Sequence, residues 1–259
     1  RDVGLSSPDI LLLQETHLKP NSFSHNFYNP RLFGTAYTVF HAHATTADSH
    51  AGVAIAVRCS ALVSKPLLIS ADDSGRWIHV QATVKNVGKI SLLSAYAPAS
   101  ASKAERADFL NALPWSELAA QAIVGGDWNC VLRPADWSTT DLNLGEARDS
   151  SHKANGPDSA ALLLRLHSRR LSDAEETRPH HEFSHTATAS NTRTSSRLDR
   201  IYLSTSLSSS LTRHVLLPRL HSLSDHCPVS ISLNLDRIPI AKPRWTLDPS
   251  ILKLPAVRL

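Results

Sequence analysis

The sequence contains no methionine, not even at position 1, so the chain cannot be a translation product that starts at its own initiator. We therefore expect a fragment, a processed piece or an incomplete gene model. The sequence also lacks any run of the roughly 18 to 20 consecutive apolar residues that a membrane-spanning helix needs. Its first 15 residues lack the order of charged, apolar and cleavage regions found in signal peptides. These absences predict a soluble protein with no membrane partner.

Cysteine is scarce, and the excess of positive charge is small. Cys59, Cys130 and Cys227 are the three cysteines, and they form no CxxC pair. An odd, scattered set is typical of free thiols in a reducing compartment and argues against a disulfide framework. The net charge of +4 and the pI of about 9.1 favour a polyanionic partner, but many proteins without such a partner share these values. Charge alone therefore decides little.

Short apolar runs and two-residue alternation predict seven strands, at 9–15, 52–59, 77–84, 89–97, 122–129, 198–204 and 227–235. Helices are predicted at 102–113, which has a serine cap, and at 157–171, where Pro157 and Asp158 mark the N-terminus. This order predicts one domain, over residues 1–235, of two mostly antiparallel sheets packed face to face with helices outside. The segment 236–259 is rich in proline and is predicted to be a tail or linker.

Acidic side chains stand at the ends of several predicted strands: Glu15, Asp127, Asp199 and Asp225. Asp199 is unusual because arginines flank it at the start of a strand that is otherwise apolar. Polar groups at strand ends can converge on one rim of a sandwich, where several carboxylates repel one another unless a cation is present. Oxygen ligands suit Mg²⁺ or Mn²⁺, which typically takes one or two carboxylates plus phosphate oxygens of a substrate.

Histidine keeps zinc as an alternative, because the chain has 14 of these residues. His41, His43 and His50 form one cluster, and His180 and His181 form a pair. None of them has the spacing of an HExxH or CxxC motif, so solvated loop histidines are the simpler interpretation.

Five short motifs occur in order between residues 9 and 235: "LLLQETH", "SAYAP", "GGDWN", "SRLDRIYLS" and "LSDHCPV". Together they resemble the successive motifs of the endonuclease/exonuclease/phosphatase superfamily, which includes exonuclease III-type repair enzymes, deoxyribonuclease I and retrotransposon endonucleases. The resemblance implies a four-layered α/β sandwich that hydrolyses a phosphodiester with a divalent ion. It also implies an earlier strand with an asparagine, which this chain starts too late to contain. We expect the missing first strand to expose sheet edges and to put activity in doubt.

The resemblance also implies roles for single residues. Glu15 is expected to bind the metal, and Asp225 either to bind it as well or to stabilise the water there. Asp127 and Asn129 would position or deprotonate the attacking water, and Tyr96 would hydrogen-bond a phosphate oxygen. Read singly, Glu15 could be a solvated strand end, Asn129 a turn residue and Tyr96 a core aromatic residue. The co-occurrence of five motifs favours the functional interpretation.

By the same resemblance, His226 would contact the scissile phosphate with Asp199 as its partner. A carboxylate beside an imidazole fixes the tautomer and favours the protonated form, which suits a histidine that must meet an anion. The alternative for Asp199 is a local ion pair with Arg197 or Arg200.

The segment before Asp199 indicates the branch of the superfamily. Abasic-site repair enzymes usually carry a tryptophan just before the "RLD" motif, and here that position is Ser196. "FSHTATASNTRTSSRLDRIYLS" instead resembles the hairpin and strand of LINE-type (non-LTR) retrotransposon endonucleases, and "PRWTLDPSIL" resembles the segment that leads from that endonuclease toward the reverse transcriptase. Arg193 and Arg197 are predicted to contact the DNA substrate.

The sequence therefore predicts a DNA endonuclease that depends on Mg²⁺, with Mn²⁺ possible, and belongs to a retrotransposon polyprotein. It would nick one strand to expose a 3′-hydroxyl for target-primed reverse transcription. The expected partners are DNA and a downstream reverse transcriptase region, and the family implies a nuclear location. The alternatives are an exonuclease III-like abasic-site repair nuclease and an inactive fragment of a decayed element, with a phosphoinositide or sphingomyelin phosphodiesterase as a weaker possibility.

Overall fold

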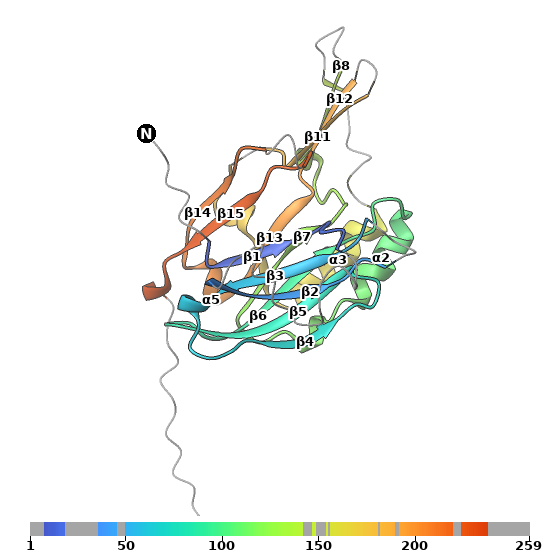
Figure 1. Cartoon of the computed structure of the whole chain (residues 1–259). Coiled ribbons are helices and arrows are strands. Elements are labelled where there is room, and N and C mark those ends of the chain that lie inside the picture. The colour runs from blue at the N-terminus through green and yellow to red at the C-terminus, as the bar shows by residue number, and fades with distance from the viewer. Residues whose placement is uncertain are drawn as a thin grey trace, which may run out of the picture.

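The computed structural model describes residues 8–18, 36–45, 50–141, 147–148, 154, 156–180, 182–189, 192–219 and 224–237 (Figure 1). The predicted tail at 236–259 lies outside the described residues beyond Arg237, and so does His181.

A six-stranded sheet holds the centre of the molecule, in the order β10-β13-β7-β6-β5-β4. Its strands are β4 (Leu67–Ala71), β5 (Trp77–Val84), β6 (Gly88–Tyr96), β7 (Ala122–Asp127), β10 (Leu171–Asp173) and β13 (Asp199–Ser204). Neighbouring strands are antiparallel except β6 and β7, which are parallel. Both faces of β6 and β7 are covered, which explains why their sequences are nearly continuous runs of apolar and small residues.

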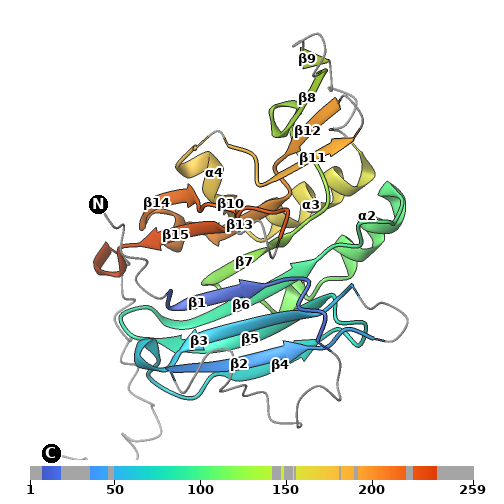
Figure 2. The same cartoon turned by 45° about the horizontal axis from the view of Figure 1, so that its top comes forward.

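Two smaller sheets pack on one face of this sheet, which we call the inner face (Figure 2). One has the order β1-β3-β2, with β1 (Ile10–Leu13), β2 (Tyr37–Ala42) and β3 (Val53–Arg58). The other pairs β14 (Leu211–Leu216) with β15 (Val229–Leu233). The core between the layers includes Ile55, Ile78, Leu92 and Leu203, all fully buried. Burial of this apolar surface is what holds the two layers together.

Helices α2 (Lys103–Ala112) and α3 (Pro157–Ser168) lie on the outer face of the six-stranded sheet. The side chain of Ser102 accepts a hydrogen bond from the backbone of Glu105, whose carboxylate accepts one from the backbone of Ser102. This capping box starts α2 at the predicted place. In the described part of the chain, no helix is long and apolar enough to cross a membrane.

A polar four-stranded sheet projects from the body (Figure 1). Its order is β11-β12-β8-β9, with β8 (Trp137–Asp141), β9 (Ala147–Arg148), β11 (His185–Ala189) and β12 (Thr192–Ser196). Strands β11 and β12 form the hairpin that the sequence resemblance implied. Two one-turn helices, α4 (Ala174–Thr177) and α5 (Thr205–Ser208), follow β10 and β13.

The predicted α/β sandwich is confirmed, with sheets that are mostly antiparallel. All seven predicted strands and both predicted helices are present, most of them shorter at their ends. Strands β2, β4, β8 to β12 and β14 were not among the predicted strands. The three cysteines are free, as expected.

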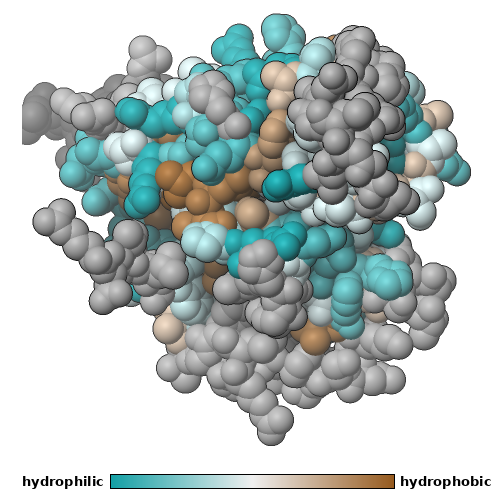
Figure 3. All heavy atoms as spheres, turned by 90° about the horizontal axis from the view of Figure 1, so that it is seen from above, coloured by the Kyte–Doolittle hydropathy of each residue, from teal (hydrophilic) through white to brown (hydrophobic). Residues whose placement is uncertain are grey.

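The open edges of β1 and β15 face one another in the inner layer (Figure 2). Among the described residues, β1 pairs only with β3, and β15 pairs only with β14. Leu12, Ile201 and Ile231 in this region are only partly buried, unlike the apolar residues of β3. Figure 3 shows an apolar area framed by hydrophilic residues on the face of the molecule seen from above. An additional strand between β1 and β15 would complete the pairing there.

Candidate active site

Three strands of the six-stranded sheet carry polar side chains at neighbouring ends. Tyr96 ends β6, Asp127 ends β7 and Asp199 begins β13, and the register pairs Tyr96 with Asp127 and Asp127 with Asp199. Directly paired residues point to the same face of a sheet, so these three side chains form a row on the inner face. Side chains of successive residues in a strand point to opposite faces of the sheet, so Arg200, which follows Asp199, points to the outer face.

Asp127 is buried and held by Asn129. The backbone N–H of Asn129 donates to Asp127 Oδ1 at 2.9 Å, and its side-chain amide donates to Asp127 Oδ2 at 3.2 Å and to the carbonyl of Ala97 at 2.8 Å. Asn129 has a φ of 46°, a left-handed conformation that asparagine tolerates well. Burial and the charge of Asp199 raise the pKa of Asp127 to about 7, although His226 and the Asn129 amide oppose this shift.

Asp199 hydrogen-bonds His226, which immediately precedes the turn into β15. His226 Nδ1 donates to Asp199 Oδ2 at 2.7 Å, which is the predicted contact. Burial disfavours the charged imidazolium, but the hydrogen bond and charge of Asp199, together with Asp127 and Asp225, outweigh it and raise the pKa of His226 to about 9. The imidazole is therefore cationic at neutral pH, with Nδ1 fixed.

We predict that this contact stabilises the fold only while His226 is protonated. Its folded-state pKa of about 9 exceeds the ordinary value of 6.5, so the contribution is fully present below that value and is lost as the pH rises through about 9. Urea unfolding of the parent and of His226→Gln at about pH 6 and about pH 9.5 tests this. The difference in free energy of unfolding should be larger at the lower pH. A difference that grows with pH would contradict the assignment.

Glu15 and Tyr96 flank Asp127 on the side of β1. The carboxylate of Glu15 lies near the Tyr96 hydroxyl, and the guanidinium of Arg76 lies 4.6 Å from the centre of the Tyr96 ring. Burial, then the Glu15 hydrogen bond and charge, raise the pKa of Tyr96 well above its usual value, so it stays a hydrogen-bond donor. Glu15 has a φ of 49°, which is strained for glutamate. Hydrogen bonds from the next two backbone amides, to Gly52 and Ala51, hold this conformation.

Asp225 lies on the other side, next to two histidines. Its carboxylate is 3.8 Å from His226 Nε2 and 3.5 Å from His185 Nε2, and its side chain is 69% exposed. The rings of His185 and His226 are 4.8 Å apart. Glu15 and Asp225, the two expected metal-binding residues, therefore flank Asp127 and His226 from different sides. In the described part of the chain, they do not share one ligand group.

The two arginines predicted to contact substrate occupy different environments. Arg193 is exposed on β12 of the projecting hairpin, where it is accessible to DNA. Arg197 is only 6% exposed, and its guanidinium pairs with Asp136 at 2.6 Å and with Glu175 at 3.1 Å. This buried position does not support the predicted contact of Arg197 with substrate. The guanidinium could reach DNA only if both of its ion pairs were broken. Arg197 has a structural place instead.

The order of these residues along the chain and their convergence in space match a known family. The sequence model described as the Endonuclease/Exonuclease/phosphatase family matches residues 3–226. The chain belongs to this family. The comparison with curated protein sequences gives no match.

Solved structures share the fold of this family member at low sequence identity. An AP endonuclease from Archaeoglobus fulgidus is 17% identical, with a TM-score of 0.64 over 88% of this chain and 89% of that chain. The endonuclease domain of TRAS1, a telomere-specific non-LTR retrotransposon, is 16% identical, with a TM-score of 0.58 over 88% and 86%. A 3′ phosphatase, NExo from Neisseria, bound to a product DNA hairpin, is 18% identical, with a TM-score of 0.59 over 88% and 89%. These likenesses establish the fold.

The donor atoms of the family site suit a divalent cation. The carboxylates of Asp127 and Asp199 lie with His226 in one group of potential ligand atoms within 4.8 Å of one another, in which the carboxylates are the groups available to a cation because His226 Nδ1 donates its hydrogen bond to Asp199. His185, Asp225 and His226 form a second such group. A bound cation would relieve the repulsion between Asp127 and Asp199, which raises the pKa of Asp127 in its absence. The carboxylate-rich set favours a hard ion.

Two residues of this site were not predicted from the sequence. His185 reaches His226 through an isolated β-bridge, and Arg76 reaches Tyr96 because β5 and β6 are neighbours. Arg76 has no motif around it, and the segment that contains His185 was interpreted as a hairpin and not as the source of a site histidine. Only the register of the strands brings them to the site, so no spacing signal in the sequence could have found them.

Proposed function

We propose that this chain is the DNA-nicking endonuclease domain of a non-LTR retrotransposon, hydrolysing one strand with Mg²⁺ or Mn²⁺ to leave a 3′-hydroxyl. The observation that carries the chemistry is the 2.7 Å hydrogen bond between His226 and Asp199, beside the buried carboxyl of Asp127. This arrangement places a cationic donor for a phosphate oxygen, His226, beside a carboxylate that can accept a proton, Asp127. In this proposal the partners are DNA and a downstream reverse transcriptase region, and the location is nuclear.

The proposed mechanism is in-line attack of water on phosphorus, which forms a new P–O bond and breaks the bond to the 3′-oxygen; that oxygen leaves and takes up a proton from solvent water. A bound divalent cation would supply charge neutralisation at the phosphate and activation of the water. Asp127, oriented by Asn129, accepts the proton of the attacking water, and its burial, which raises the pKa of its carboxyl, makes it a stronger base than an exposed aspartate. His226 keeps Nδ1 on Asp199 and directs Nε2 to the oxygen that gains charge. Tyr96 adds a hydrogen bond to the phosphate, and the carboxylates of Glu15 and Asp225 would hold the cation.

The retrotransposon assignment is supported by the projecting hairpin. Ser196 is buried at the end of β12, where the family's repair enzymes are expected to carry an aromatic residue. Thr192, Arg193 and Thr194 make the hairpin polar, which suits contact with phosphates better than enclosure of a bare sugar. The fold shared with the TRAS1 domain is consistent with this proposal. An exonuclease III-like repair nuclease is the second candidate, favoured by the fold shared with AP endonucleases.

The first test measures nicking of supercoiled plasmid by the protein expressed in its longest reading frame. We expect open-circular product with Mg²⁺ or Mn²⁺, no product in chelator, and 3′ ends that a DNA polymerase can extend. His226→Ala serves as the matched inactive control. Nicking that persists in excess chelator would contradict the proposed metal-dependent mechanism. Absence of nicking with every divalent ion would favour the decayed, inactive element.

The second test separates the retrotransposon nuclease from the repair enzyme. We predict that an abasic duplex is cleaved no more than about tenfold faster than the intact duplex of the same sequence. This limit corresponds to roughly 1.4 kcal/mol, which incidental flexibility of the DNA at the lesion could contribute. The measurement is single-turnover cleavage of two labelled duplexes that differ at one position. A preference of about a thousandfold or more for the abasic strand would overturn the assignment in favour of repair.

A further inference from the structure

The residues at the start of the projecting hairpin contact both members of the Asp199–His226 pair. Ser184 is fully buried, and its hydroxyl oxygen accepts hydrogen bonds from the backbone N–H groups of Leu198 at 3.1 Å and Asp199 at 3.0 Å. Its carbonyl accepts one from the N–H of Cys227 at 2.7 Å, directly after His226. Ser184 therefore connects the backbone at Asp199 with the backbone at His226.

His185, the first residue of β11, contacts the imidazole of His226 itself. The two rings are 4.8 Å apart at an interplanar angle of 45°, and the two backbones form an isolated antiparallel bridge. His185 Nδ1 lies 3.3 Å from the hydroxyl of Ser196, and Nε2 lies 3.5 Å from the carboxylate of Asp225. Burial, then the charge of His226, lower the pKa of His185, so its neutral ring can pack against the imidazolium without repulsion. A ring held from both nitrogens restricts the positions that the His226 ring can take.

The hydrogen bond to Asp199 leaves one motion of the His226 ring unrestricted. It fixes Nδ1 at 2.7 Å from the carboxylate, whereas the atom that must meet the phosphate is Nε2. Rotation of the ring plane about this hydrogen bond would move Nε2 away from its direction. A second contact with the ring, such as the one that His185 makes, opposes this rotation because side chains packed at van der Waals distance cannot move independently.

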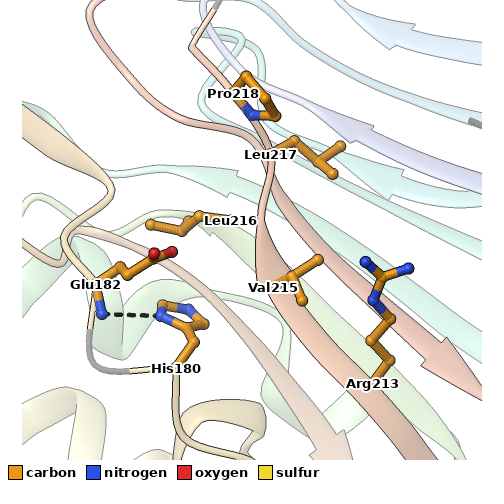
Figure 4. Close-up of a pocket in the computed structure, with 7 residues that line it drawn as sticks. All are labelled: His180, Glu182, Arg213, Val215, Leu216, Leu217 and Pro218. Atoms are coloured by element: carbon orange, nitrogen blue, oxygen red, sulfur yellow. Dashed lines mark hydrogen bonds between the residues drawn. The ribbon is translucent and has the colours of Figure 1, made fainter. Parts of the chain in front are cut away.

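The segment before Ser184 borders open space instead of packing tightly against β14. His180 and Glu182 lie on one side of a cavity of about 460 Å³, and side chains of β14 and of the segment that follows it lie on the other (Figure 4). Open space of this size offers no packing that could hold the segment in place. The hydrogen bonds of Ser184 and the ring of His185 therefore carry more of the positioning of His226.

We propose that His185 is a positioning residue for His226, and that its ring holds the imidazole in the orientation that directs Nε2 to the phosphate. The inference rests on the proposed function, in which His226 donates to a phosphate oxygen. Because His185 begins β11, the hairpin proposed to contact DNA also supplies the support of the catalytic pair. Loss of the ring should therefore slow the cleavage of bound DNA and leave DNA binding unchanged.

The test compares His185→Ala and His185→Phe with His167→Ala, which changes an exposed histidine on α3. Single-turnover cleavage gives the rate constant for bound DNA, and fluorescence anisotropy in Ca²⁺ gives the affinity. We expect His185→Ala to lower the rate constant at least about tenfold with DNA affinity within about twofold of the parent, as for loss of a contact that orients a functional histidine. His185→Phe, which keeps an aromatic ring against His226, should recover the rate to within about threefold of the parent. His167→Ala should match the parent.

A second measurement does not depend on nuclease activity. The proton on His226 Nδ1, in a charge-assisted hydrogen bond to Asp199, should give a far-downfield NMR signal in the metal-free protein near neutral pH. His226→Gln should abolish this signal, which identifies it. We expect the signal to be sharp in the parent and in His185→Phe and to broaden or disappear in His185→Ala, because a loosely held ring exposes the proton to exchange with water.

Two results would overturn the inference. One is a His185→Ala variant that cleaves bound DNA within about twofold of the parent rate. The other is a slow His185→Ala variant whose Nδ1 signal stays sharp, because the loss would then come from a contact of His185 with DNA. If the parent cleaves no DNA, the proposed function fails, and the Nδ1 signal of His185→Ala decides the inference by itself. His185→Asn, which lacks the ring but keeps a polar group, replaces His185→Ala if that variant does not fold.

Discussion

Replacing His226 by alanine is expected to lower the turnover of DNA nicking by about 10²- to 10³-fold, equivalent to roughly 2.7–4 kcal/mol of transition-state stabilisation. The reason is that His226 presents a cationic donor to the phosphate, with Nδ1 held by Asp199 at 2.7 Å. The loss should appear in the single-turnover rate constant for cleavage of bound DNA and much less in DNA affinity. Binding measured by fluorescence anisotropy in Ca²⁺ makes this distinction.

Asp199→Asn should reproduce much of this loss, because an amide neither favours the imidazolium nor fixes its tautomer. His167→Ala, on the exposed surface of α3, should nick at the parent rate and controls for loss of a histidine as such. If Asp199→Asn nicks like the parent while His226→Ala does not, Asp199 has only a structural role. In that case the proposed coupling between the two residues fails.

The environment of Asp199 shows how far sequence reasoning reaches into the site. Two arginines flank Asp199 in sequence, and an ion pair with one of them was the simple alternative to the pair with His226. The alternation of side chains along β13 separates Asp199 from Arg200, which pairs with Asp173 at 2.6 Å on the outer face. The motif order therefore predicted the partner of Asp199. The carboxylates that pair with Arg200 and Arg197 lie 27 and 61 residues away along the chain, so the local sequence does not identify them.

Predicted strands such as β6 and β7 differ from the unpredicted strands β11 and β12 in how strongly burial shapes their sequences. β6 and β7 are covered on both faces and read as continuous runs of apolar and small residues. Strands β11 and β12 are built from threonine, serine, alanine, histidine and arginine, so no apolar alternation marks them. Their pairing depends on backbone hydrogen bonds and on their neighbour β8. Only the resemblance to a family with a hairpin here anticipated them.

The second large effect is expected for Arg197, whose environment contradicts a role in binding substrate. Arg197→Met should lower the free energy of unfolding by about 3–5 kcal/mol, because it leaves part of a buried ion-pair network without its cation. Asp136, which is fully buried, would lose a 2.6 Å contact, and Glu175 would lose one of 3.1 Å. Urea denaturation followed by tryptophan fluorescence measures the loss, with an unchanged m-value as evidence that the transition remains two-state.

Arg193→Met is the matched comparison, since it removes the same charge four residues earlier on the exposed hairpin. Its stability should stay within about 0.5 kcal/mol of the parent, because exposed substitutions seldom cost more. Its DNA affinity should instead fall, with a slope of log affinity against log salt that is smaller by about 1, as expected when one phosphate contact is lost. The opposite pattern, in which Arg197→Met keeps its stability but loses salt-dependent DNA affinity, would return Arg197 to the substrate-binding surface. It would also mean that its pairs with Asp136 and Glu175 open in solution.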